Sequence, residues 1–323
     1  VMRLWAGPGA GWRREYPDSA VAPHDFAMNP KSNTIWAACT DGTIAEWSPQ
    51  SDSQPRVFRA DPKCAYTVDY SPSLDLLASA GEAGYVVLTR ERKRVPPELV
   101  VLPGFPVVDL RFSPDGRFLA ACSKYSPLVV YDTRSWMPVR SIGLKIGRLA
   151  TVRWSPDGTS IAVSGSDGGC EVFAAPDFRS IASWKALSGV CRTAVFSPDG
   201  SLIATGGDDG VVRFWATGSW QQRGEIQISN DNIFCLAFHP DGHVLAVGDR
   251  SGRVTQVGVP EAKALASFMA GSPVMTLEFD GAKLVVGTID RPIEVWDFGM
   301  LAGCVQGDAG YWKARLEQPG GKP

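Results

Sequence analysis

The sequence has few of the side chains on which enzymes and metal sites usually depend. Only three histidines occur among 323 residues, which leaves little material for histidine catalysis or metal ligation. The seven cysteines are an odd number and include no Cys-x-x-Cys pair, so neither a disulfide framework nor a zinc site is indicated. We interpret them as reduced core thiols of an intracellular, cytoplasmic protein, and we expect no disulfide.

Long apolar runs and a surplus of charge are also missing. No stretch approaches 18 consecutive apolar residues, and the first eight residues lack an apolar secretory core, so neither a membrane span nor a signal peptide is expected. The formal net charge is only −2, so we expect no nucleic-acid partner, because such proteins usually carry a basic surface. With 44% hydrophobic and 20% charged residues, the chain has the composition of a protein with a packed core.

What the sequence does contain is a repeat. Proline recurs every 42 residues at six positions, each preceded at two residues by a large apolar residue: Pro30, Pro72, Pro114, Pro156, Pro198 and Pro240. In five of the six copies a glycine follows the proline by twelve residues, and a seventh copy starts at Phe279 without the Ser-Pro pair. A period of 40–45 residues is typical of a repeat that forms one four-stranded unit.

Each copy predicts four short strands. Ser-Pro-Asp-Gly suits a type I turn after the first strand, and an Asp-Gly pair indicates a hairpin between the second and third. The second strand is apolar on both faces, which is typical of a buried strand, whereas the fourth is polar and suits an outer edge. The seven first strands are expected at 24–28, 66–70, 107–112, 149–154, 191–196, 233–238 and 274–279.

With these features the chain resembles the WD-repeat family. The resemblance rests on the Phe-Ser-Pro-Asp-Gly turns, on the segment 206–215 and on the closing dipeptide Trp296-Asp297, echoed by Tyr131-Asp132. It implies an all-β fold: a seven-bladed β-propeller of four-stranded antiparallel blades, with one domain at 1–306 and a tail at 307–323. The family's Gly-His pair is absent from every copy, so its buried His–Asp network is missing, and apolar packing between blades is expected to stabilise the ring.

The N-terminus suggests how the ring closes. Residues 1–6 match 211–216 at an offset of 210, which is five periods, and Trp12–Tyr16 then falls on a fourth strand. In the family an N-terminal strand completes the last blade, so the resemblance implies that Trp12–Tyr16 pairs with Ile293–Asp297. The alternative is that Leu301–Gln306 fills that place. Residues 1–6 are then surplus, either part of a longer chain or the product of a residue added before Met2.

Two hypotheses about function remain open. The first is a non-enzymatic scaffold or adaptor, either a monomeric disc or a subunit of a larger chain or complex, that docks a protein or peptide on its loop face. The second is a propeller enzyme or small-ligand sensor of the lactonase-like kind that uses the central channel. The scarcity of histidine and the absence of a Gly-x-Ser-x-Gly motif favour the first, so we assign no catalytic residue, cofactor or metal.

The resemblance also places the docking face. Two positions per blade are expected at the rim of the channel: the residue before the hairpin Asp position, and the residue eight before the repeat proline. The candidate partner-binding residues at or beside these positions are Glu82, Lys124, Tyr125, Arg148, Asp208 and Arg250. Because Lys124, Tyr125 and Arg148 come from neighbouring blades, they predict one patch for an acidic or aromatic-bearing segment. The basic run Arg90–Arg94 is either a solvated loop, a localisation signal or a patch for an anionic partner.

Overall fold

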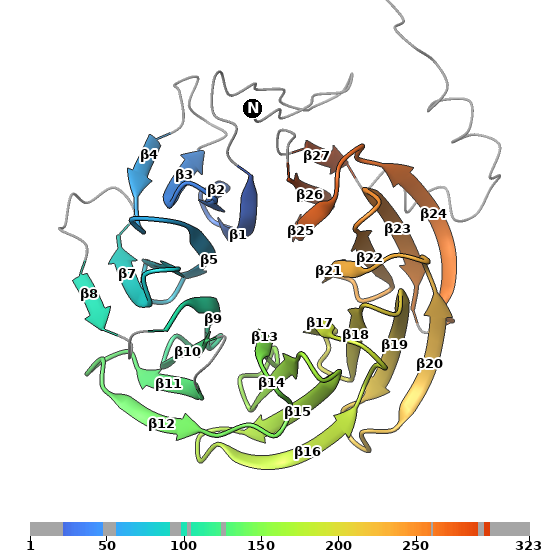
Figure 1. The fold of residues 1–323 in the computed structure, drawn as a ribbon, viewed down its shortest axis with the longest axis horizontal. Helices are drawn as coiled ribbons and strands as arrows, with labels where there is room; N and C mark the ends of the chain where they lie inside the picture. The colour runs from blue at the N-terminus through green and yellow to red at the C-terminus, as the bar shows by residue number, and fades with distance from the viewer. Residues whose placement is uncertain are drawn as a thin grey trace, which may run out of the picture.

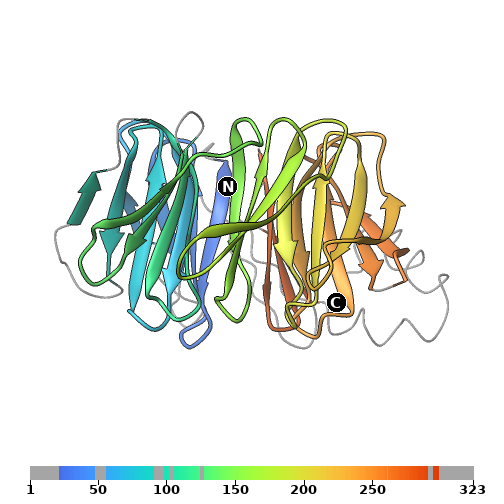
Figure 2. The same ribbon diagram turned by 90° about the horizontal axis from the view of Figure 1, so that it is seen from below.

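The strands form separate antiparallel sheets arranged around a ring. The computed structural model describes residues 22–47, 56–90, 98–101, 105–123, 127–259, 261–289 and 294–297. Figure 1 shows the sheets placed radially about a central axis, and Figure 2 shows their strands running from one face of the disc to the other. The architecture is therefore an all-β propeller, as the repeat predicts.

Six blades are complete, and each has four strands in sequential order. The first three blades contain β1 (Pro23–Asn29), β2 (Thr34–Cys39), β3 (Thr43–Trp47), β4 (Arg56–Arg59); β5 (Ala65–Ser71), β6 (Leu76–Gly81), β7 (Tyr85–Thr89), β8 (Glu98–Val101); and β9 (Val107–Phe112), β10 (Phe118–Ser123), β11 (Leu128–Asp132), β12 (Pro138–Ile142). The next three contain β13 (Leu149–Trp154), β14 (Ser160–Gly165), β15 (Gly169–Ala174), β16 (Arg179–Lys185); β17 (Cys191–Phe196), β18 (Leu202–Gly207), β19 (Val211–Ala216), β20 (Gln222–Gln227); and β21 (Ile233–Phe238), β22 (Val244–Asp249), β23 (Arg253–Gly258), β24 (Lys263–Met269).

The seventh sheet has three strands within the described ranges: β25 (Val274–Asp280), β26 (Lys283–Thr288) and β27 (Glu294–Asp297). The prediction of seven complete four-stranded blades is thus met by six. The two candidates for the missing strand, 12–16 and 301–306, both lie outside the described residues, as does the tail at 307–323. The first strands of all seven sheets begin and end within one residue of the ranges that the repeat indicates.

The Ser-Pro-Asp-Gly turns form as predicted. In the third blade the Gly116 N–H donates to the Ser113 carbonyl at 2.8 Å, and the Ser113 hydroxyl donates to Asp115 at 2.6 Å. Gly116 has φ +73°, a conformation that glycine adopts without a steric penalty. The same serine also accepts the Phe118 N–H at 2.9 Å, so the turn sets the start of the second strand.

The core lies between the blades. The second strands β2, β6, β10 and β22 are buried along their whole length, whereas four of the five residues of the outer strand β12 are exposed. The aromatic stripe before the repeat prolines is core, since Tyr70, Phe112 and Trp154 are all buried. The six cysteines in the described ranges are free thiols, five of them buried; Cys304 lies outside those ranges. No helix in the described ranges is long and apolar enough to cross a membrane.

Candidate functional site

The two rim positions predicted for each blade lie next to one another. In the fourth blade the Ser166 N–H donates to the Arg148 carbonyl at 2.8 Å, and in the sixth the Arg250 N–H donates to the Asn232 carbonyl at 2.9 Å. The equivalent bond forms in the first, second, fifth and seventh sheets. A glycine at the end of the second strand permits this approach in the fifth blade: a Cβ on Gly207 would lie 1.9 Å from the Val190 carbonyl oxygen.

The candidate rim residues differ in their exposure and in their contacts. Arg148 and Arg250 are exposed. Asp208 accepts hydrogen bonds from Arg192 Nε at 2.5 Å and from Asn232 Nδ2 at 2.9 Å, so it joins the fifth blade to the sixth.

Glu82 accepts the Tyr66 hydroxyl at 2.5 Å. Burial and this bond raise the pKa of Tyr66 well above its ordinary value. Lys124 and Tyr125 lie outside the described residues, so the patch that they are predicted to form with Arg148 stays a prediction.

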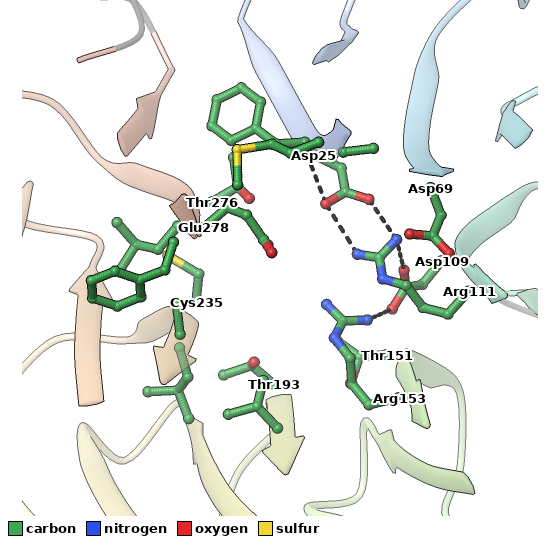
Figure 3. Close-up of a pocket in the computed structure, with 18 of the residues that line it drawn as sticks. Asp25, Asp69, Asp109, Arg111, Thr151, Arg153, Thr193, Cys235, Thr276 and Glu278 are labelled. Carbon is green, nitrogen blue, oxygen red and sulfur yellow. Dashed lines mark hydrogen bonds and ion pairs between the residues drawn. The ribbon is translucent and has the colours of Figure 1, made fainter. Parts of the chain in front are cut away.

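The sequence interpretation missed a second set of polar residues, which line the central channel. They occupy positions five and three residues before the repeat proline, on the first strand of each blade. The channel has a volume of about 720 Å³, and Figure 3 shows its charged side chains concentrated on one wall, with one glutamate opposite. The charged members are Asp25, Asp69, Asp109, Arg111, Arg153 and Glu278.

Side chains of this channel layer join each of the first three blades to the next. Asp25 Oδ2 accepts the Val68 N–H at 3.2 Å, and Asp109 Oδ2 accepts the Val152 N–H at 2.9 Å. Between these two, Thr67 Oγ1 accepts the N–H of the residue that follows Asp109, at 3.2 Å. Each acceptor lies 43 residues before its donor, so the repeat itself generates a polar ladder across three blade interfaces.

Two guanidinium groups complete this wall. Arg111 binds both carboxylate oxygens of Asp25, at 2.8 and 3.1 Å, and Asp109 at 3.1 Å, and Arg153 forms an ion pair with Asp109. Burial by itself lowers the pKa of Arg111, but the carboxylates of Asp109, Asp25 and Asp69 outweigh it and raise this pKa. Arg111 is therefore a fixed cation at the centre of the wall.

Within the channel layer, two carboxylates have no such cation at hydrogen-bond distance among the described residues. Asp69 accepts the Phe112 N–H at 2.6 Å, and burial raises its pKa to about 6. Glu278 is exposed to the channel and makes no hydrogen bond or ion pair with any residue of the described ranges. Burial inside the disc raises its pKa to about 7, which Arg111 partly offsets.

The family is decided by comparison with known proteins. Residues 194–282 match the family model described as the anaphase-promoting complex subunit 4 WD40 domain, and residues 98–126 and 146–173 match that of the WD domain, G-beta repeat. The chain belongs to the WD-repeat family. A search of curated proteins finds no match.

In this WD-repeat propeller the stability between blades does not rest on apolar packing alone, as the missing His–Asp network led us to expect. The ladder of the channel adds charged and polar contacts between the first four blades. A signal for it is visible in the sequence, since Asp25, Asp109, Arg111 and Arg153 interrupt otherwise apolar first strands at matching repeat positions. No group of three His, Cys, Asp or Glu side chains suited to a metal ion occurs in the described part.

Proposed function

We propose that this WD-repeat propeller is a non-enzymatic scaffold that docks a protein or peptide on the face carrying the second-to-third strand connections. WD40 propellers generally mediate protein–protein interaction, and loops on a rigid scaffold are suited to recognition. The observation that carries the proposal is the pairing of the two rim positions in six of the seven sheets, because backbone hydrogen bonds hold the rim in place in those sheets.

The partner that we propose is an acidic or aromatic-bearing segment bound beside Arg148, with Lys124 and Tyr125 from the preceding blade. Arg148 is exposed on this face, and arginine and tyrosine are over-represented among residues that dominate interface energies. The match to a family model described as a subunit's WD40 domain supports the further proposal that the disc works within a larger assembly. An intracellular location is part of the same proposal.

Charge reversal tests this docking face. The variant K124E/R148E should lose most of the partner recovered by affinity purification from cells, with an unchanged melting temperature, since exposed charges contribute little to folding. The matched control is R134E/R179E, which reverses two exposed cations on the opposite face: Arg134 lies between β11 and β12, and Arg179 begins β16. If K124E/R148E recovers as much partner protein as R134E/R179E does, the proposed face is rejected. The opposite face and the Arg90–Arg94 loop then become the next candidates.

We also propose that Trp12–Tyr16 completes the seventh blade by pairing with β27. The outer edge of β27 pairs with no strand among the described residues, and an unpaired edge is a site of aggregation. Deleting residues 1–20 should cost roughly 3 kcal/mol of stability, the order of one strand's burial and hydrogen bonds, whereas deleting 307–323 should cost little. If the first deletion is neutral, the alternative that 301–306 fills this place is favoured.

The channel supports a second candidate function, the binding of a small ligand. Its polar wall and Glu278, which has no hydrogen-bond partner among the described residues, are the observations that favour it. A stoichiometric divalent metal in the purified protein would favour the lactonase-like enzyme over the scaffold.

A further inference from the structure

The charges of the channel do not balance. Four carboxylates and two guanidinium groups belong to the channel layer, and Asp280 lines the same cavity beyond that layer. Asp25 and Asp109 are paired with Arg111 and Arg153, so within the channel layer the carboxylates of Asp69 and Glu278 have no ion-pair partner among the described residues. A cavity with this surplus favours a positively charged occupant, because opposite charges interact more strongly where protein excludes bulk water.

The distribution of the carboxylates restricts the kind of cation. The described residues hold no cluster of three potential ligands close enough for one metal ion. A cation that carries several N–H donors, such as guanidinium or ammonium, does not need converging ligands, because each donor can meet a different acceptor.

The mouth of the channel fits a cation carried on a flexible chain. The residues one position before the channel layer include aromatic rings, with His24 packed edge-on against Tyr66 at 5.4 Å between ring centroids. Farther round the ring, the Arg192 guanidinium lies over the Phe234 ring at 5.2 Å, so this mouth already holds one cation against an aromatic face. Such faces attract cations and pack against methylene groups.

We propose that the central channel binds one organic cation, a guanidinium or primary ammonium group, which donates hydrogen bonds to Glu278 opposite the Arg111 wall. Its carbon chain leaves through the mouth lined by His24 and Tyr66. This site is separate from the rim at Arg148, so either proposal can fail without the other.

Calorimetric titration at low ionic strength tests the site with two probes. N-acetyl-arginine amide represents a side chain of a docked segment, and spermidine represents a free polyamine; N-acetyl-citrulline amide is the neutral control of the same shape as the first. We expect saturable binding of one or both cations at one equivalent and none of the citrulline amide. Tighter binding of the arginine amide assigns the site to a partner's side chain, and tighter binding of spermidine to a free amine. No saturable binding, or equal binding of the citrulline amide, overturns the proposal.

The variant Glu278→Gln removes the charge that the proposal requires. It should weaken cation binding at least about tenfold, the size expected for one charge-assisted hydrogen bond, whereas Glu261→Gln, at an exposed position between β23 and β24, should not. Equal effects of the two variants would contradict the assignment. Circular dichroism establishes that both variants are folded.

A pH series on the unaltered protein gives a test that needs no variant. The charged groups that bear on Glu278 are Arg111, Arg153, Asp25 and Asp69. Because its pKa is raised to about 7, the ionised fraction rises about tenfold between pH 6 and pH 8. Cation affinity should rise several-fold over the same range, and an affinity that stays constant or falls would refute the role of Glu278.

Discussion

Replacing Asp109 by alanine should destabilise the propeller more than any other single change in the channel wall. Its side chain is 6% exposed and meets both Arg111 and Arg153, and it accepts the Val152 N–H at 2.9 Å. Removing one partner of a buried ion pair costs about 3–5 kcal/mol because the other charge stays buried. Arg111 keeps Asp25 as a partner and the side chain of Arg153 is 25% exposed, so we expect the lower end, about 3 kcal/mol.

The assay is thermal unfolding followed by tryptophan fluorescence. At about 2–4 °C per kcal/mol for a large domain, the midpoint of Asp109→Ala should fall by roughly 6–12 °C. Asp109→Asn keeps an acceptor for the Val152 N–H and should fall less. The control is Asp177→Ala, whose ion pair with Arg179 joins two side chains that are 60% and 70% exposed, and which should cost under about 0.5 kcal/mol. If Asp109→Ala unfolds within about 2 °C of the parent, or if the control costs as much, the ladder does not stabilise the ring.

Three further outcomes follow from the packing and the charges. Gly207→Ala should cost at least about 2 kcal/mol in denaturant unfolding, because its Cβ would lie 1.9 Å from the Val190 carbonyl oxygen and overpacking strains the fold; Gly218→Ala, with open space around its Cβ, is the control. Burial raises the pKa of Glu278 to about 7 against an ordinary 4.5, so ionising this carboxylate costs more in the folded protein than in the unfolded chain, and stability falls as pH rises from about 4.5 to 7. Glu278→Gln should therefore stabilise the protein at pH 8 by about 1 kcal/mol after allowance for solvent screening in the channel, and have little effect at pH 4. Among the six described cysteines, Cys64 alone is not buried, so it should react first with a thiol reagent in the native protein, though slowly, because burial raises its pKa to about 11; fast reaction of Cys122 or Cys170 would contradict the packing.

The blades could be predicted because their signals are local. A proline that presets φ and a glycine that takes a positive φ act within four residues, as at Ser113–Gly116, and the 42-residue period repeats the same signals until chance is excluded. The meeting of the two rim positions could be placed by register as well, since it follows from strand pairing inside one blade.

The channel wall was decided by tertiary structure. Asp25 and Arg111 are 86 residues apart, and nothing in the local sequence of either strand indicates that the other is its partner. Their ion pair forms only when three blades pack side by side and turn the same two repeat positions toward one axis. The same holds for Glu278, whose pKa is raised chiefly by burial inside the ring and is further shifted by charged side chains on four other blades. The sequence by itself thus determined the repeating unit, because its strands and turns form from neighbouring residues, whereas the electrostatics of the channel arise only where those units meet in a ring.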